Sequence, residues 1–305
     1  MGASRQTPGA DGPKQKLPKS RTGIAGLDEI TDGGLPRNRA TLVCGGPGCG
    51  KTVLAMEYLL HGAQRFEEPG LFVSFEESPP QLRASFLPLG FDIEALEADD
   101  KLAISHLKLS AGEVTEAGGF SLDGLFVQLE QGIARIGAKR VVLDTLESLF
   151  SNLSDSERLR AELARLLDWL KARDVTVVVT GERGAAELTR HGFEEYVSDC
   201  VLLLDHRISN QISKRRLRIV KYRGSAHGKD EYPFLITDSG FSVLPITSVK
   251  LDYAVGQRRV STGIDDLDAM LGGAGYFEGS TVIATGPAGT GKSTLGASFA
   301  AATCA

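Results

Sequence analysis

The chain is predicted to fold as an α/β protein with a mainly parallel sheet, because apolar strand-like runs alternate with helical segments. The runs are rich in Val, Ile and Leu and show no polar alternation, which is typical of strands covered on both faces. They occur at residues 41–45, 71–75, 141–144, 176–180 and 200–204. Between them, segments such as 122–136 and 159–170 carry apolar residues at helical spacing. The alternation predicts a twisted parallel sheet flanked by helices.

The pattern changes after residue 205. Residues 216–223 and 234–237 are strand-like and are separated by the turn-like stretch 224–228. Strands joined by short turn segments pair in antiparallel fashion. We therefore expect an antiparallel C-terminal extension on the parallel sheet.

A phosphate-binding loop joins the first strand to the first helix. Residues 45–52 read GGPGCGKT and match the pattern G-x-x-x-x-G-K-[ST]. Glycines let backbone N–H groups converge on phosphate oxygens, the lysine neutralises phosphate charge, and the hydroxyl binds Mg²⁺. The sequence thus predicts ATP and Mg²⁺ as ligands. The expected ATP contacts within the same subunit are Gly45, Gly48, Cys49, Gly50, Lys51, Thr52 and Val53.

The chain repeats itself. The heptapeptide TGIAGLD at 22–28 recurs as TGIDDLD at 262–268, and a second phosphate loop, GPAGTGKS, occupies 286–293. Two motifs at nearly one offset indicate a duplicated domain. We expect a disordered tail (1–20), a first ATPase domain (21–248), a linker (249–260) and the truncated start of a second domain (261–305). ATP contacts expected in the second loop are Gly289, Thr290, Gly291, Lys292, Ser293 and Thr294.

Three acidic residues lie at the end of a predicted strand or directly after it. Asp144 ends the run 141–144, where a P-loop enzyme places the carboxylate that holds Mg²⁺ together with the loop hydroxyl, here Thr52. Glu76 and Glu77 follow the run 71–75 and could supply the general base that activates water. The alternatives are a strand-end cap for Asp144 and a solvated loop for the two glutamates. Further candidates for similar work are Glu147 and Glu182.

A basic segment, residues 221–227, follows four cationic positions: Lys214, Arg215, Arg216 and Arg218. One interpretation is an edge strand protected by charge. Another is a set of side chains that reach the phosphates of a neighbouring subunit. A nucleic-acid stripe is disfavoured because Tyr222 is the only aromatic residue for base stacking there. The spacing alone leaves the first two interpretations open.

Bulk composition narrows the class of protein. The 305 residues carry a net charge of −5 with a pI near 5.7, which argues against a nucleic-acid binder that uses its whole surface. The four cysteines form no C-x-x-C pair, so neither a zinc site nor a disulfide framework is expected. No apolar run approaches the length of a membrane span. We expect a cytoplasmic protein with no membrane partner and no nucleic-acid partner.

Taken together, these motifs resemble the KaiC family of RecA-like ring ATPases. The resemblance rests on 22–24 (TGI), 33–36 (GGLP), both phosphate loops, 75–79 (FEESP), 195–199 (EYVSD), 221–227 (KYRGSAH) and 231–234 (EYPF). It implies a RecA-like fold and a homohexamer with ATP between subunits. It further implies that Glu76 and Glu77 are the catalytic pair of a slow ATPase. The residues that it implies reach ATP from the neighbouring subunit are Lys221, Tyr222, Arg223, Ser225, His227, Thr237 and Asp238.

The resemblance also implies a role in circadian timing or related signalling, and a KaiB-like partner protein. Full-length relatives would be Ser/Thr autokinases, whereas kinase activity is not expected of these 305 residues. Two other functions are considered. One is an ATP-dependent scaffold that does not hydrolyse its nucleotide, and the other is a RecA-type ATPase that acts on DNA.

Overall fold

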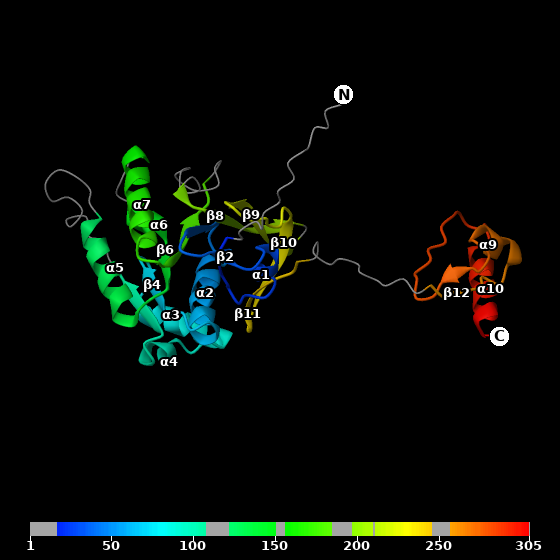
Figure 1. Cartoon of the computed structure of the whole chain (residues 1–305), viewed down its shortest axis with the longest axis horizontal. Helices are drawn as coiled ribbons and strands as arrows, with labels where there is room; N and C mark the ends of the chain where they lie inside the picture. The colour runs from blue at the N-terminus through cyan, green and yellow to red at the C-terminus, as the bar shows by residue number, and fades with distance from the viewer. Residues whose placement is uncertain are drawn as a thin grey trace, which may run out of the picture. The chain divides into compact units, whose positions relative to one another are not determined.

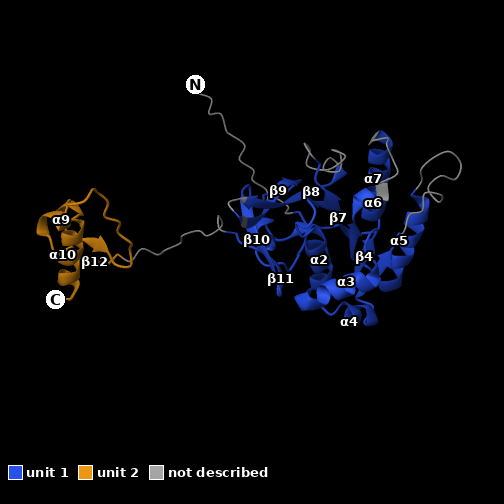
Figure 2. Cartoon of the chain, turned by 180° about the vertical axis from the view of Figure 1, so that it is seen from behind, with its two compact units in different colours: residues 1–248 blue, residues 249–305 orange. Residues whose placement is uncertain are grey.

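The computed structural model describes residues 17–107, 122–150, 156–184, 197–209, 211–245 and 257–304. Within these ranges the chain divides into two units, Met1–Ser248 and Val249–Ala305, which Figure 2 colours separately. The first unit holds a large sheet with helices on both faces, and the second holds two short strands and two helices (Figure 1).

A nine-stranded sheet forms the centre of the first unit, in the order β11-β10-β9-β8-β3-β7-β6-β4-β5. The strands from β8 to β5 are parallel, and those from β9 to β11 are antiparallel to their neighbours. The parallel strands are β3 (Ala40–Gly45), β4 (Gly70–Ser74), β5 (Leu102–His106), β6 (Arg140–Asp144), β7 (Thr176–Glu182) and β8 (Cys200–Ser209). The antiparallel strands are β9 (Ile212–Tyr222), β10 (Glu231–Thr237) and β11 (Gly240–Val243). The predicted α/β fold with an antiparallel extension is confirmed.

Helices cover the two faces of the sheet because successive strand residues point to opposite sides. Phe72 of β4 packs into the same apolar cluster as α2 (Lys51–Arg65). Leu71 and Val73 of that strand join the other cluster, with α5 (Asp123–Ile136) and α7 (Ser156–Lys171). The shorter elements are β1 (Lys19–Ser20), α1 (Leu27–Ile30), β2 (Leu35–Pro36), α3 (Pro79–Phe86), α4 (Ile93–Ala98) and α6 (Leu146–Phe150).

The hairpin β10–β11 is fastened to α2. The backbone N–H of Phe241 donates to Glu57 Oε1 at 2.6 Å, in the middle of the helix. Gly240 has a φ of 90°, and a Cβ there would lie 2.5 Å from the same oxygen, so only glycine fits. Burial raises the pKa of Glu57 to about 7, and the hydrogen bond from Phe241 offsets part of that effect. The end of β10 is thereby held beside the helix that follows the phosphate loop.

The second unit repeats the opening of the first in structure as well as in sequence. It contains β12 (Arg259–Val260), α9 (Asp265–Met270), β13 (Tyr276–Phe277) and α10 (Lys292–Cys304). In the first unit, the Thr22 N–H and hydroxyl donate to Asp28 Oδ1 at 2.8 and 2.7 Å. In the second, Thr262 donates from the same two groups to Asp268 Oδ1 at 2.8 and 2.6 Å. Duplication therefore preserved the hydrogen bonds that shape this turn.

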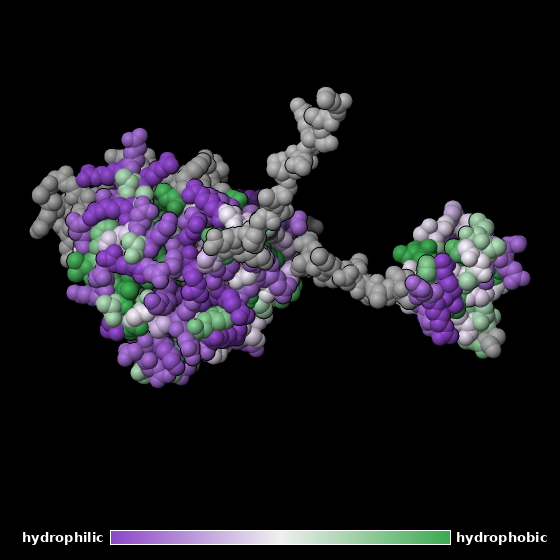
Figure 3. Space-filling view, in the orientation of Figure 1, coloured by the Kyte–Doolittle hydropathy of each residue, from purple (hydrophilic) through white to green (hydrophobic). Residues whose placement is uncertain are grey.

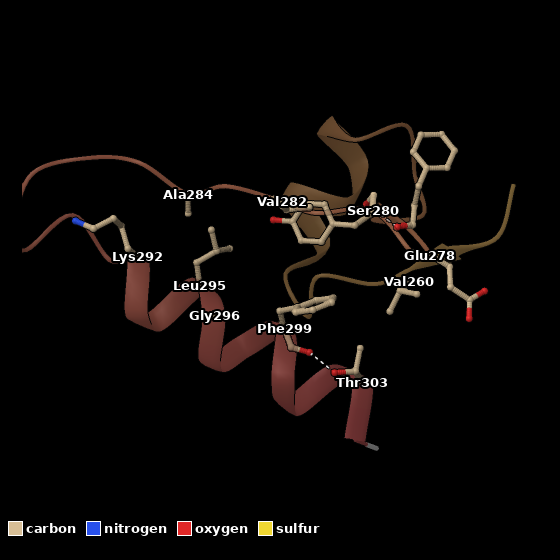
Figure 4. A pocket seen from close by; sticks show the side chains of 13 residues that line it. Val260, Glu278, Ser280, Val282, Ala284, Lys292, Leu295, Gly296, Phe299 and Thr303 are labelled. Atoms are coloured by element: carbon tan, nitrogen blue, oxygen red, sulfur yellow. Dashed lines mark hydrogen bonds between the residues drawn. The ribbon is translucent and has the colours of Figure 1, made fainter. Parts of the chain in front are cut away.

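The second unit has little interior of its own. Residues 281–286 correspond to β3 but form no strand, and none of the described residues of α10 is buried. In Figure 3 apolar side chains are prominent on its visible face. A cavity of about 320 Å³ lies along α10, where Leu295 and Phe299 face Val260 and Val282 (Figure 4). A β3-like run is stabilised by strand partners on both sides, and among the described residues of the second unit none pairs with 281–286.

Candidate active site

The phosphate loop, residues 45–52, connects β3 to α2 in the first unit. Gly48 and Gly50 have φ values of 68° and 105°, a region that favours glycine. A Cβ on Gly50 would lie 2.5 Å from Ile236 Cδ1, so the loop is packed against β10. Cys49 is buried, and burial raises the pKa of its thiol. The loop has the conformation that exposes backbone N–H groups at the start of a helix.

Lys51 is held by the backbone of its own loop. Its Nζ donates to the Gly45 and Gly46 carbonyl oxygens at 3.0 and 3.1 Å. In the second unit Lys292 makes the same pair of contacts, to Gly286 and Pro287 at 2.7 and 2.5 Å. The two loops therefore position their lysines alike.

Asp144, at the carboxyl edge of the sheet, connects β6 to helix α2 and to strand β7. The Thr52 hydroxyl donates to its Oδ2 at 3.0 Å, and the Thr180 hydroxyl donates to its Oδ1. Burial raises the pKa of Asp144, with the charges of Glu76 and Glu77 adding to the rise, while the two hydroxyl bonds oppose it. A buried carboxylate beside a hydroxyl is a set of hard oxygen donors, the kind that Mg²⁺ prefers. The residues present thus fit a magnesium ion.

Glu76 and Glu77 lie next to Asp144 because β4 and β6 are neighbours. Ser74 pairs with Asp144 in register, and the Phe75 N–H donates to the Asp144 carbonyl at 2.8 Å. Glu76 is exposed, and its Oε1 accepts hydrogen bonds from two hydroxyls, Thr145 at 3.0 Å and Ser148 at 2.5 Å. One of the two glutamates is therefore oriented by the start of α6.

Sequence reasoning missed three hydroxyls of this site: Thr145, Ser148 and Thr180. Thr145 and Ser148 follow the strand end at Asp144, where the sequence pattern points only to the acid, and Thr180 lies on β7. The contact of Thr180 with Asp144 follows from the order of β3, β7 and β6, which a single sequence does not reveal. For Thr180, the available signal in the sequence was a threonine near the end of the predicted strand 176–180.

The basic segment lies at the opposite end of the sheet from the phosphate loop. Tyr222 pairs with Cys200, which pairs with Thr41 at the beginning of β3, whereas Gly45 at its end pairs with Leu204. Four residues of strand separate the two positions by about 13 Å. The segment therefore does not line the phosphate loop of its own chain.

Several side chains of this segment have partners within the chain. The Tyr222 hydroxyl donates to the Gly34 carbonyl at 2.7 Å, and its ring is buried. Lys19 Nζ donates to the Ser225 hydroxyl at 2.7 Å and lies 3.7 Å from the Tyr222 ring centroid. The His227 ring stacks on the Tyr222 ring, and the two ring centroids are 6.2 Å apart. Strand β1 thus fixes the shape of the loop that follows β9.

Thr237 and Asp238 lie elsewhere, at the end of β10. Their neighbour Ile236 packs on Gly50, and the Asp238 carbonyl oxygen is 3.9 Å from where a Gly90 Cβ would be. Thr237 and Asp238 thus directly follow a residue that contacts the phosphate loop of its own chain. The structure does not bring them together with residues 221–227, although both groups were expected to reach one ATP from the neighbouring subunit.

Comparison with known proteins identifies the family. A family model described as "ATPase: KaiC" matches residues 20–248 and 260–305. "Circadian clock protein KaiC2" of Synechocystis sp. is 52% identical over 288 residues, which cover 94% of this chain and 51% of that protein. "Circadian clock oscillator protein KaiC" of Synechococcus elongatus is 38% identical over 305 residues, covering 99% of this chain and 59% of that protein.

The chain spans a little over half the length of these relatives. In the described part of the chain, none of the helices has the length and apolar character that crossing a bilayer requires. The family model covers both units and both phosphate loops. This chain belongs to the KaiC family of ATPases.

Proposed function

We propose that the first unit hydrolyses ATP with Mg²⁺, at a site completed by a neighbouring copy of the chain. The observation that carries this proposal is the bridge from the phosphate loop to the catalytic acids. Thr52 contacts Asp144, whose strand neighbour β4 leads directly to Glu76 and Glu77. Phosphate binding, metal binding and water activation therefore have their groups at one edge of the sheet.

Binding of the phosphates is assigned to the backbone N–H groups and side chains of the loop. The contributing residues are Gly45, Gly48, Cys49, Gly50, Lys51, Thr52 and Val53. Lys51 exchanges its two carbonyl partners for phosphate oxygens, which are stronger acceptors because they are charged. In the second unit, Gly289–Thr294 would bind a second nucleotide in the same way.

Thr52 and Asp144 would hold the magnesium ion through a hydroxyl and a carboxylate oxygen. The ion neutralises charge on the β- and γ-phosphates when it is bound. Thr180 keeps its hydrogen bond to the other oxygen of Asp144, which fixes the orientation of the carboxylate. The raised pKa of Asp144 reflects burial of a charge for which a cation would compensate.

Glu76 and Glu77 would orient a water molecule and accept its proton as the water oxygen attacks the γ-phosphorus. The bond from that phosphorus to the β–γ bridging oxygen breaks, and ADP leaves with the electron pair. The hydrogen bonds from the Thr145 and Ser148 hydroxyls fix the orientation of the Glu76 carboxylate for this step. Positioning of this kind is a large part of catalysis in phosphoryl transfer.

The basic segment is proposed to contact the nucleotide of the next subunit in a hexameric ring. Its distance from the phosphate loop of its own chain supports an intersubunit role for Lys221 and Arg223. Tyr222, Ser225 and His227 would shape that segment. Thr237 and Asp238 are better placed to approach the nucleotide of their own chain.

The names of the relatives support a role in circadian timing or related signalling. The KaiB-like partner and the autokinase activity of full-length relatives are proposed from the sequence resemblance alone. The scaffold alternative receives less support, because an inactive site would not require Glu76 to be held by two hydroxyls. The DNA-acting alternative receives less support from the net charge of −5. Hydrolysis stimulated by single-stranded DNA would revive it.

A mixing experiment tests the shared site. The variant Glu76→Gln/Glu77→Gln lacks the acids, and Lys221→Ala/Arg223→Ala lacks the intersubunit cations. Each alone is expected to release phosphate slowly. In an equimolar mixture with random exchange of subunits, about a quarter of the sites regain both intact halves, because each half is intact with a probability of about one half. Recovery of about a quarter of the wild-type rate is expected, and no recovery would refute the shared site.

A further inference from the structure

The first turn of α6 contacts two parts of the site that are far apart in the sequence. Ser148 and the preceding Thr145 donate hydrogen bonds to Glu76, which follows β4. Between them in the chain, the buried side chain of Glu147 accepts a hydrogen bond from the Glu182 N–H at 2.5 Å, at the end of β7. One turn of helix thus connects Glu76 to β7.

The sequence around Glu147 accommodates this contact. Its Oε1 lies 3.4 Å from where a Cβ on Gly181 would be, a van der Waals contact, so the carboxylate packs directly against the end of β7. A carboxylate buried this deeply is costly unless it accepts hydrogen bonds, and a backbone N–H is a rigid donor. The contact therefore fixes α6 relative to the end of β7.

The end of β7 is in turn connected to the phosphate loop. Glu182 pairs with Gly45 in register, and the N–H of the next residue, Arg183, donates to the Gly45 carbonyl at 3.1 Å. The same carbonyl accepts from Lys51 Nζ at 3.0 Å. A shift of Lys51 toward bound phosphate would change the partners of Gly45, one residue away from the anchor of Glu147.

We infer that Glu147 is a positioning residue, which sets the orientation of Glu76 by anchoring the start of α6 to the β7 strand beside the phosphate loop. It acts through Thr145 and Ser148, whose hydroxyls hold the Glu76 carboxylate. This inference rests on the proposed role of Glu76 as a catalytic acid.

The test compares two substitutions at one position in the full chain. Glu147→Leu removes the acceptor at similar size, and Glu147→Gln keeps an oxygen that accepts the Glu182 N–H. We expect Glu147→Leu to lower kcat about tenfold with the KM for ATP within about twofold of wild type. We expect Glu147→Gln to retain at least about half of kcat, because the amide oxygen replaces the carboxylate oxygen. Equal loss in both variants, or a loss confined to KM, would overturn the inference.

A double-mutant cycle separates positioning from general damage to the fold. In a Glu76→Gln background, Glu147→Leu should cause no further loss, since it acts through the group already removed. Additive losses would overturn the inference. If Glu147→Leu does not fold, Ser148→Ala, at a half-exposed position, takes its place. Its loss of kcat is then compared between the wild-type and the Glu76→Gln backgrounds in the same way. Should Glu76→Gln alone turn over at the wild-type rate, the proposed function fails. A low kcat for Glu76→Gln together with a wild-type kcat for Glu147→Leu would refute only the positioning role.

Discussion

Replacing both Glu76 and Glu77 by glutamine is expected to slow phosphate release by about 10²- to 10⁴-fold, the range that a general base contributes. The amides cannot accept the proton of the attacking water. Binding of ATP should survive, because the loop and Lys51 are unchanged. Phosphate release and the binding of a fluorescent ATP analogue are measured on the same protein.

The matched control is Glu94→Gln, which makes the same chemical change at an exposed position of α4. Its rate should equal that of wild type. The two single variants at 76 and 77 then show which carboxylate is the base. Glu76 is the one held by Thr145 and Ser148, so its replacement is expected to cost more. Wild-type turnover by the double variant would remove both residues from the mechanism.

The second large effect concerns stability and Arg140, at the beginning of β6. Its side chain is 1% exposed and donates to Glu68, to the Tyr58 carbonyl at 2.7 Å and to the Arg21 carbonyl at 2.9 Å. Arg140→Met leaves the carboxylate of Glu68 without its buried partner. Breaking a buried ion pair from one side costs about 3–5 kcal/mol in the free energy of unfolding. Urea denaturation of the two proteins measures this difference.

Arg37→Met is the control, because Arg37 contacts the same carboxylate at 2.6 Å from a side chain that is 42% exposed. A pair of that kind contributes about 1 kcal/mol or less. The pKa of Glu68 would be raised by burial, but Arg140 and Arg37 hold it below its ordinary value. Stability from this pair is therefore lost as the pH falls through that lowered pKa, and the deficit of Arg140→Met should shrink in acid. Equal losses in both variants would contradict the buried-pair account.

Much of the first unit could be predicted because its strands are buried on both faces and its phosphate loop has a strict pattern. The predicted run 41–45 became β3 with a shift of one residue at its beginning. β5 was missed, since Leu102–His106 has only two buried residues and ends in polar ones. A strand at the edge of a sheet presents a weaker apolar signal than one at its centre.

The site was harder to predict than the fold because it depends on the order of the strands. Thr52 and Asp144 are 92 positions apart and meet because β7 alone lies between β3 and β6. The resemblance groups Lys221 with Thr237, and the structure places them near the ends of β9 and β10, two strands that run in opposite directions. The last residues of two antiparallel strands lie at opposite edges of the sheet, even when the strands follow each other in the sequence.

The second unit shows where a local pattern stops being sufficient. Its threonine–aspartate turn forms within seven residues and reproduces that of the first unit. The run 281–286 has the composition of a central strand but forms none. The corresponding strand of the first unit, β3, has its backbone hydrogen bonds satisfied by β7 and β8, which come much later in the sequence.

The central claim is that ATP is hydrolysed in the first unit at a site shared between copies of the chain. Phosphate release per chain, followed across a dilution series with Mg²⁺ and ATP while particle mass is recorded, tests it most directly. The account predicts that the rate per chain falls to background as the assembled particle dissociates. A constant rate from a monomer, or an assembled particle that releases no phosphate at any concentration, would contradict it.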